Sequence, residues 1–350
     1  MHIFDYANIK LNITEDLIQT IASIGEFKGE QNLFLDMQAD ALSALAELAK
    51  IQSTEASNKI EGIYTNAERL KQLVLDKTNP KNRSEKEIAG YRNILKLIHE
   101  NYKYIPVKPS YILQMHKELY IYSEKNYGGK YKAVDNFITQ ENELGETLVR
   151  FRPIPAWETP SAMEGVCEAL AKAEEKNSIN ALLLIPMFIL DFLCIHPFND
   201  GNGRMSRLLT LLLFYRAGFN VGKYVSIEKK IEQTKESYYD ALFESSQGWH
   251  ENKNDYMPFI KYMLGVLLAA YRDFKERVNI LEKPPTKSQR ISELIKNKLG
   301  AITKSEIREL CFDISDITIQ RTLADLTEKG DIKKIGGGRY TKYVWSGDRR

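Results

Sequence analysis

The stretch HPFNDGNGRMSR, residues 196–207, constrains the fold most because it joins two strongly apolar segments. Residues 179–195 before it predict a central buried helix, and residues 205–217 after it predict a second one. Pro186 either kinks the first helix or marks its delayed start. The stretch is therefore expected to be a helix–loop–helix joint in the core.

The residue types of this joint suit phosphoryl chemistry. Its two glycines permit backbone conformations in which several N–H groups face one anion at a helix start. Its aspartate is an oxygen ligand suited to Mg²⁺, and its two arginines share a helix face that can bind neighbouring phosphates. Its histidine is placed to act as a general base. These residues are His196, Asp200, Gly201, Gly203, Arg204 and Arg207.

Composition narrows the class of protein. Hydrophobic residues make up 43% of 350 residues, which is typical of a folded globular chain. Cys167, Cys194 and Cys311 are widely spaced in apolar surroundings, which argues against a disulfide framework or a zinc site. Neither a signal peptide nor an apolar run of membrane-spanning length is found. We expect a cytoplasmic protein with no membrane contact.

Helical periodicity dominates the first 280 residues or so, so the expected fold class is mainly α. Helices are predicted at residues 31–51, 84–102, 109–120, 161–175, 232–247 and 255–278. Ser57 can cap a short helix that Gly62 ends. Residues 134–138 and 147–151 predict a β-hairpin around a turn at 143–145.

The C-terminal segment has a different pattern. From residue 283 onwards there are 15 Lys and Arg against 9 Asp and Glu, a net charge of +6, whereas the first 282 residues carry −4. Helices are predicted at 287–299, 305–310 and 315–329, followed by a two-stranded wing around residues 336–338. This order resembles a winged helix-turn-helix domain.

Two interpretations of that domain stay open, DNA binding and protein docking. DNA binding would use the third helix and the wing, through Thr318, Gln320, Arg321, Asp325, Lys333, Lys334 and Arg339. The acidic residues Asp316 and Asp325 weaken it, because DNA phosphates repel carboxylates. We expect three parts overall: an N-terminal helical region at 1–105, a core at 106–282 and the winged helix at 283–350.

Residues 196–207 match, at every fixed position, the signature HxFx(D/E)GNGRxxR of the Fic family, whose members are mostly protein adenylyltransferases. The helical body, the hairpin and the later helix with Tyr238 and Tyr239 are also similar to that family, over roughly residues 30–275. The resemblance implies a Fic-type helical core with a β-hairpin flap, followed by the winged helix.

The resemblance also implies a reaction. AMP would pass from ATP to a Tyr, Ser or Thr hydroxyl of a target protein or of the chain itself. His196 would accept the hydroxyl proton, and Asp200 would hold Mg²⁺. The residues that bind the phosphates and stabilise their charge would be Gly201, Asn202, Gly203, Arg204 and Arg207.

Residues 57–62, SNKIEG, match the family's inhibitory motif (S/T)xxxE(G/N). The resemblance implies an inhibitory helix at about residues 55–63 that includes Ser57, Glu61 and Gly62. Glu61 would pair with Arg207 and misplace the ATP phosphates, so that in-line geometry is lost.

Several expectations within the family stay open. The hairpin at 134–151 is the expected flap for a target strand, although Lys130 or Lys132 stands where an arginine is common. Tyr238 and Tyr239 fit either an adenine contact or core packing. Some relatives remove AMP or transfer UMP or phosphocholine. The alternative function is a DNA-binding regulator whose Fic core senses nucleotide, and the implied partners are a target protein, a second copy of the chain, and DNA or a protein at the winged helix.

Overall fold

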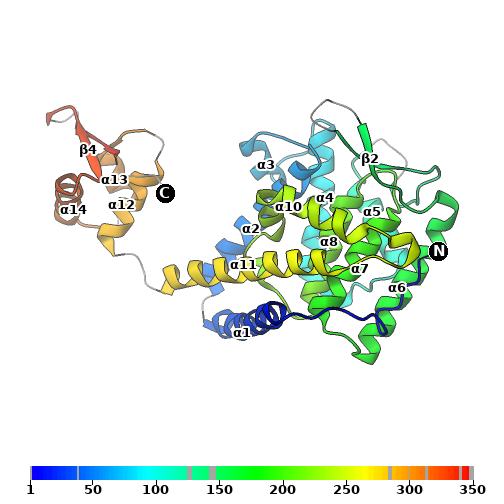
Figure 1. The fold of residues 1–350 in the computed structure, drawn as a ribbon. Helices are drawn as coiled ribbons and strands as arrows, with labels where there is room; N and C mark the ends of the chain where they lie inside the picture. Colours follow the sequence, from blue (N-terminus) through cyan, green and yellow to red (C-terminus); the bar gives the residue numbers. More distant parts are fainter. Residues whose placement is uncertain are drawn as a thin grey trace. The chain divides into compact units, whose positions relative to one another are not determined.

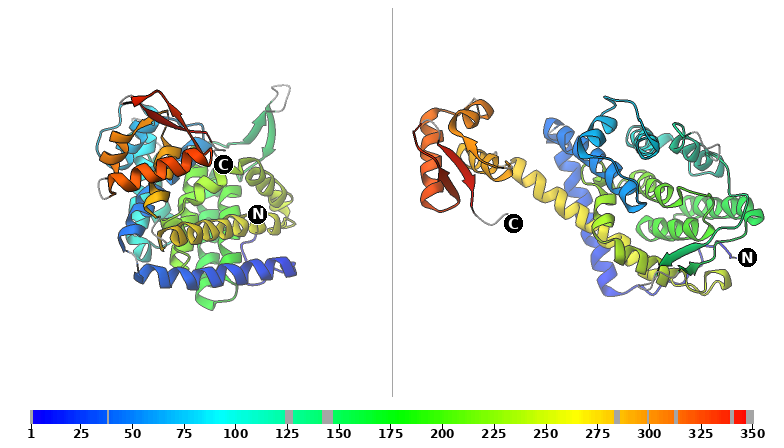
Figure 2. Two further views of the ribbon diagram at one scale, coloured as in Figure 1. Left: turned by 90° about the vertical axis from the view of Figure 1, so that its left-hand side faces the viewer. Right: turned by 90° about the horizontal axis from the view of Figure 1, so that it is seen from above.

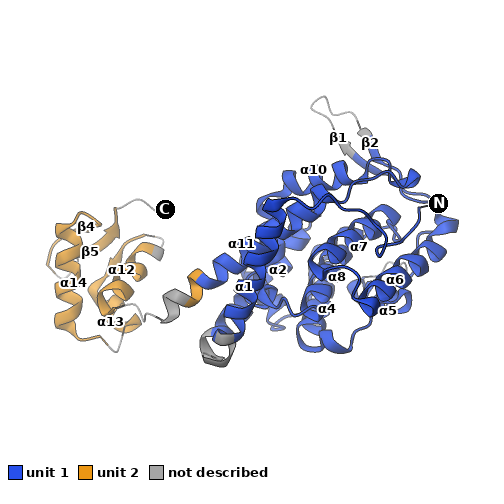
Figure 3. Ribbon diagram, turned by 60° about the horizontal axis from the view of Figure 1, so that its bottom comes forward, with its two compact units in different colours: residues 1–275 blue, residues 276–350 orange. Residues whose placement is uncertain are grey.

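The structure, a computed structural model, describes residues 2–37, 39–123, 128–141, 147–282, 286–298, 300–311, 314–338 and 341–346. The chain forms two compact units, Met1–Lys275 and Glu276–Arg350 (Figure 3). The division lies within α11, which spans Met257–Glu282. Residues 283–285, where we expected the boundary, lie outside the described residues, and the three-part division stays a prediction.

Unit 1 is built from helices and one hairpin (Figure 1). Its helices are α1 (Glu15–Met37), α2 (Ala39–Ile60), α3 (Ala67–Val74), α4 (Arg83–Asn101), α5 (Pro109–Leu119), α6 (Thr159–Lys176), α7 (Ala181–Ile195), α8 (Asn202–Arg216), α9 (Ile227–Gln233), α10 (Lys235–Ser246) and most of α11. Short 3-10 turns connect them at η1 (Tyr102–Tyr104), η2 (Ala156–Glu158), η3 (Val221–Lys223) and η4 (Trp249–Glu251). The mainly α fold class is confirmed.

The centre of unit 1 is the helix pair α7 and α8. Every side chain of α7 from Leu182 to Phe192 is buried, as the apolar sequence predicts. α7 begins at Ala181 and contains Pro186 in its second turn, so the alternative of a delayed start is wrong. The joint between the two helices places residues 196–201 at one end of this pair.

The N-terminal helices differ from prediction in their bounds. The predicted helix at 31–51 is wrong, because α1 ends at Met37 and α2 begins at Ala39. α1 lies along α11 (Figures 1 and 2), where Phe27 stacks on Tyr271 with 6.4 Å between ring centroids. The first half of α1 escaped prediction because this tertiary packing, rather than a clear apolar stripe, stabilises it.

Two further helix predictions need correction. Ser57 does not cap a short helix, because it is fully buried inside α2. Gly62 does follow the helix end, in a left-handed conformation with φ 75°. The predicted helix at 232–247 is two helices, because the Thr234 N–H bonds to Lys230 and Ile231 carbonyls and closes α9 before α10 begins.

The flap pairs β1 (Ile138–Glu141) with β2 (Thr147–Phe151) in antiparallel register. Ile138 faces Phe151 and Thr139 faces Val149, so Arg150 is the extra residue of a bulge. The predicted first strand is wrong at 134–137, which precede β1. The predicted turn at 143–145 lies outside the described residues.

Unit 2 contains α12 (Lys287–Asn297), β3 (Ile302–Thr303), α13 (Lys304–Leu310), α14 (Asp316–Glu328), β4 (Ile332–Ile335) and β5 (Lys342–Trp345). Its core is formed by buried side chains that include Ile291, Ile307, Ile319 and Leu323. The sheet order is β3-β5-β4, with β3 added to the predicted wing. Arg339 lies outside the described residues, and the winged-helix assignment stays a prediction.

Across the residues that the structure describes, no helix is both long and apolar enough to cross a membrane.

Candidate active site

His196 lies at the end of α7, in a left-handed backbone conformation with φ 50°. Its N–H donates to the Phe192 carbonyl at 3.0 Å, and its Nδ1 lies 3.3 Å from the Leu193 carbonyl oxygen. A hydrogen bond to that carbonyl puts the proton on Nδ1 and leaves Nε2 as the acceptor. Burial lowers the pKa of His196 to about 4, so the ring is neutral near pH 7.

The loop after His196 is fixed by side chains on both sides. Phe198 is fully buried and stacks on His116 of α5, with 3.7 Å between ring centroids. The His116 Nε2 lies 3.0 Å from the Asp200 carbonyl oxygen, and its Nδ1 accepts the Gly129 N–H at 3.0 Å. The sequence does not single out His116, because its partner Asp200 is 84 residues away in the chain.

Asn202 holds the same loop. Its Oδ1 accepts the Phe198 N–H at 2.9 Å, and its Nδ2 donates to the Phe198 carbonyl at 2.8 Å. The side chain is 2% exposed. Both ends of the amide therefore shape the turn, and the expected contact of Asn202 with the phosphates stays a prediction.

The two glycines lie at the start of α8. Gly201 has φ 86°, and a Cβ there would come within 3.0 Å of the Tyr120 hydroxyl. A Cβ at Gly203 would overlap Glu61 Oε1. Gly201 must be glycine because of its positive φ, and Gly203 must be glycine because no space is left for a Cβ. The first N–H groups of this helix have no partner within the helix, which gives the predicted anion cradle its physical basis.

Arg207 is buried and contacts the predicted inhibitory segment. Its Nη2 lies 2.8 Å from Glu61 Oε1, and its Nε and Nη2 donate to the Ser57 hydroxyl and carbonyl, each at 2.9 Å. Burial opposes the charge of Arg207, but the Glu61 carboxylate raises the pKa of the guanidinium above its usual value. The predicted pairing of Glu61 with Arg207 is present.

Arg204 and Asp200 are placed differently from Arg207. Arg204 is 1% exposed, and its Nη1 lies 2.8 Å from Glu87 Oε2. Its Nη2 donates to the Tyr120 hydroxyl at 2.8 Å and lies 3.5 Å from Asp200 Oδ1. Arg204, held by Glu87 and Tyr120, thus orients the Asp200 carboxylate from the buried side of the loop. Glu87 was not recognised from the sequence, because nothing near it in the chain marks it as a partner.

A cavity of about 360 Å³ gathers part of the predicted site. Its polar lining includes His196, Gly203, Arg207 and Glu61. Its apolar part is formed by Ile138, Phe151, Leu190, Leu193, Leu242 and Phe243. Tyr238 and Tyr239 also line it, so both predicted tyrosines lie at the cavity. The other predicted site residues lie outside the cavity lining: Asp200, Gly201, Asn202, Arg204, Ser57 and Gly62.

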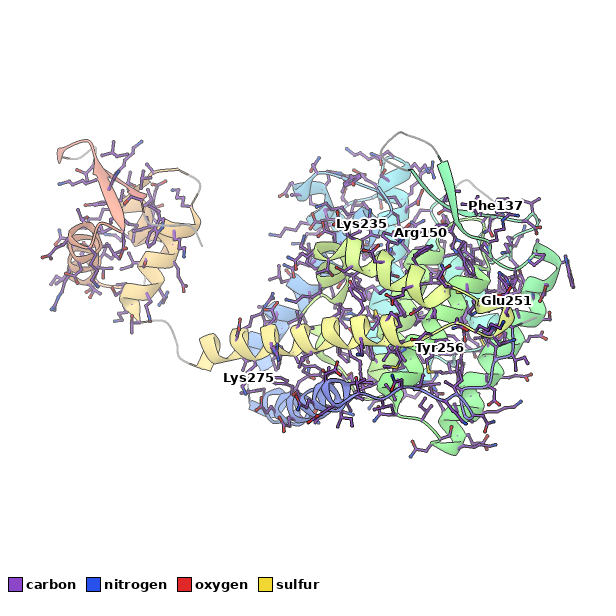
Figure 4. The ribbon with its side chains drawn as sticks, viewed as in Figure 1. Phe137, Arg150, Lys235, Glu251, Tyr256 and Lys275 are labelled. Carbon is purple, nitrogen blue, oxygen red and sulfur yellow. The ribbon has the colours of Figure 1, made fainter. Side chains whose placement is uncertain are left out.

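Arg150 is a lining residue that the sequence did not single out. It extends from the flap toward α10 (Figure 4), where it lies 3.3 Å from Asp240 Oδ1 and 4.8 Å from the centre of the Phe243 ring. No sequence pattern marked it, because its place in a bulge follows from the strand register, which only the structure shows. It adds a second cation to the cavity besides Arg207.

The site has one carboxylate suited to a metal carried by a nucleotide. The Asp200 side chain is 42% exposed. No group of three or more His, Cys, Asp or Glu that could hold a metal by itself occurs in the part of the chain that the structure describes. Mg²⁺ bound mainly through phosphates needs only one or two protein carboxylates. Asp200 therefore fits such an ion.

Comparisons with known proteins agree with this site. A family model described as Fic/DOC family matches residues 106–214, which include α7, the loop and most of α8. The protein adenylyltransferase Fic of Culex quinquefasciatus is 26% identical in an alignment 269 residues long, which covers 70% of this chain and 48% of that protein. The protein of the same name from Drosophila mojavensis is 25% identical in an alignment 309 residues long, which covers 79% of this chain and 56% of that one. The chain thus spans about half the length of these curated relatives.

Solved structures extend the likeness to the fold. A Fic family protein from Desulfovibrio desulfuricans has a TM-score of 0.60 at 21% identity, covering 97% of this chain and 99% of that chain. A Fic domain-containing signaling protein from Bacteroides thetaiotaomicron has a TM-score of 0.60 at 20% identity, covering 71% and 94%. Residues 106–214 are thus the part of the chain that matches the Fic/DOC family, and the solved Fic proteins share the fold.

Proposed function

We propose that this chain is a protein adenylyltransferase, which transfers AMP from ATP to a Tyr, Ser or Thr hydroxyl of a target protein and of itself. The observation that carries the proposal is the cavity in which the His196 imidazole, the start of α8 and Arg207 meet. These supply a base, an anion site and a fixed cation in one place. The names of the Culex and Drosophila relatives support the same reaction.

In the proposed reaction, the target hydroxyl oxygen attacks the α-phosphorus of ATP. A new oxygen–phosphorus bond forms, the bond to the β-phosphate oxygen breaks, and diphosphate leaves. His196 Nε2 takes the hydroxyl proton, which its neutral state at pH 7 allows. The N–H groups at Gly201 and Gly203 stabilise the charge on the α-phosphate, and Arg207 neutralises the outer phosphates.

Magnesium would be held by Asp200 and by the phosphates, whose charge it offsets when bound. Arg204 keeps Asp200 oriented through the contacts with Glu87 and Tyr120. In this role Arg204 acts from beneath the loop, because its guanidinium is buried and paired.

We further propose that Glu61 restrains the enzyme. In its present position the carboxylate occupies the space beside Gly203 and Arg207, where ATP phosphates would bind. The target segment would pair with the flap strands near His196, since Ile138 and Thr139 line the cavity. Unit 2 would recruit the target or another partner.

Labelled ATP tests the reaction. With ATP labelled at the α-phosphate, the chain is expected to become labelled, and with ATP labelled at the γ-phosphate it is not. His196→Ala should lower incorporation by at least about 10²-fold, because the general base is lost. Label retained from the γ-phosphate, or full incorporation in His196→Ala, would refute the proposal.

Label incorporation combined with a DNA-binding measurement distinguishes the alternatives. A DNA-binding regulator would show salt-sensitive duplex binding by unit 2 and no incorporation. The exposed Lys333 and Lys334 of β4 favour that reading, while Arg308 and Asp316 form an ion pair that leaves little net charge at the start of α14. An enzyme that uses another nucleotide would take label from UTP or CTP, and one that removes AMP would release it from a modified target.

A further inference from the structure

Three backbone carbonyls next to His196 are bound by one short segment that the reaction scheme above does not use. This segment, residues 128–136, connects α5 to the flap. The Lys132 N–H donates to the Pro197 carbonyl at 2.8 Å, and the Lys132 ammonium donates to the Ile195 carbonyl at 3.1 Å. The carbonyls on both sides of His196 therefore bond to the same lysine.

Asn136 completes the arrangement. Its Oδ1 accepts the Lys132 ammonium at 2.9 Å, and its Nδ2 donates to the Phe198 carbonyl at 3.0 Å. Lys132 and Asn136 together thus bind the carbonyls of Ile195, Pro197 and Phe198. Asn136 lies two residues before β1, so the same contacts join the loop to the base of the flap.

The position of the Lys132 ammonium has a clear physical effect on α7. Ile195 is the last residue of that helix, and its carbonyl has no partner within the helix. A cation at this end is stabilised by the helix dipole and satisfies the carbonyl. Lys132 is only 3% exposed, so its ammonium is bonded mainly to protein groups rather than to water.

His196 needs such support. Its left-handed backbone, φ 50°, is unfavourable for a residue with a Cβ and persists only where the surroundings fix it. We propose that Lys132, together with Asn136, is a positioning residue that caps α7 and holds His196 in the backbone conformation that aims its imidazole into the cavity. It does so without touching the nucleotide, since Lys132 and Asn136 are absent from the cavity lining.

The charge of Lys132 has a second consequence at His196. The groups that act on the imidazole are the Leu193 carbonyl, Lys132, Glu61 and Asp200, besides burial itself. Burial is the largest cause of the lowered pKa of His196, and Lys132 adds to it, while Glu61 and Asp200 act the other way. Burial also lowers the pKa of Lys132 itself, to about 8, which still leaves it mostly protonated at neutral pH.

The inference rests on the proposed function, so its test uses the Glu61→Gly background, in which transfer should be fast. Lys132→Met keeps the length of the side chain and removes both side-chain hydrogen bonds. It should lower kcat for self-transfer on the order of 10²-fold, since a displacement of about 1 Å has that effect, and leave KM for ATP within about twofold. Lys132→Arg should recover most of the loss, and Asn136→Ala should show a smaller loss of the same kind.

Lys28→Met is the matched control. Lys28 also donates to the carbonyl at the end of a core helix, that of Ala217 after α8, at 2.9 Å. It does not line the cavity. Its loss should lower the melting temperature by an amount similar to Lys132→Met and leave kcat unchanged. A kcat of Lys132→Met equal to the parent, or an equal loss in Lys28→Met, would overturn the inference.

A readout that does not depend on transfer separates this inference from the function itself. The NMR resonances of the His196 imidazole, assigned by their absence in His196→Ala, should move in Lys132→Met and in Asn136→Ala but not in Lys28→Met. If no variant transfers AMP and these resonances still move, the function fails and the positioning role stands. Unmoved resonances would refute the positioning role.

Discussion

The carboxylate of Glu61 lies against Gly203, so closely that a Cβ on residue 203 would overlap Glu61 Oε1. Gly203 is the second residue of α8, where the unpaired N–H groups and the helix dipole attract anions. Glu61 is thus an intramolecular anion at the position that a nucleotide phosphate would need. Its carboxylate neutralises Arg207 at the same time, at 2.8 Å.

Removing that carboxylate should release the site. Glu61→Gly is expected to raise self-incorporation of α-label about tenfold or more, because both the helix start and Arg207 become available to phosphate. Glu61→Gln retains the size but loses the charge, and should give an intermediate rate. An unchanged rate in Glu61→Gly would show that this contact does not limit ATP binding.

The pH dependence of transfer should reflect the lowered pKa of His196. Burial lowers the pKa of His196 to about 4 from an ordinary value of 6.5, so the fraction of neutral base stays near one down to about pH 5. The acid limb of kcat, measured in Glu61→Gly at saturating ATP, should therefore fall below pH 5. An acid limb centred at pH 6.5 would mean that the ring is solvated during turnover.

Local sequence determined much of the site and fold. The joint at 196–207 could be predicted because its glycines, aspartate and arginines lie close together in the sequence. The buried face of α4 could be predicted from the helical spacing of its apolar residues. Ser57 was misread as a cap, because its true partner, Arg207, is 150 residues away. Lys132, His116 and Glu87 act through similarly distant contacts, and periodicity carries no information about such pairs.

The role of Ser57 can be measured as stability. Ser57→Ala removes the hydroxyl that accepts the Arg207 Nε at 2.9 Å, and a hydrogen bond to a charged group contributes about 1.5–3 kcal/mol. Thr54→Val, one turn earlier on α2, removes a hydroxyl that donates to the Lys50 carbonyl of its own helix. Urea unfolding should show a clearly larger loss for Ser57→Ala. Equal losses would mean that the serine does little to hold Arg207.

His99 offers a test of how burial links stability to pH. The ring is 8% exposed, and burial lowers its pKa to about 3, with Lys50 and Lys223 acting in the same direction. Between pH 6.5 and 3 the unfolded chain binds a proton at this position and the folded chain does not. The neutral ring therefore contributes to the stability of the fold above pH 6.5, and this contribution is lost as the pH falls.

His99→Gln removes this titration. The free energy of unfolding of the wild type, relative to the variant, should therefore fall by about 2 kcal/mol from pH 7 to pH 5. Comparing the two proteins cancels the opposite effect of Asp191 and Glu228, whose pKa values burial raises. A difference that is the same at both pH values would show that His99 is hydrated in the folded protein.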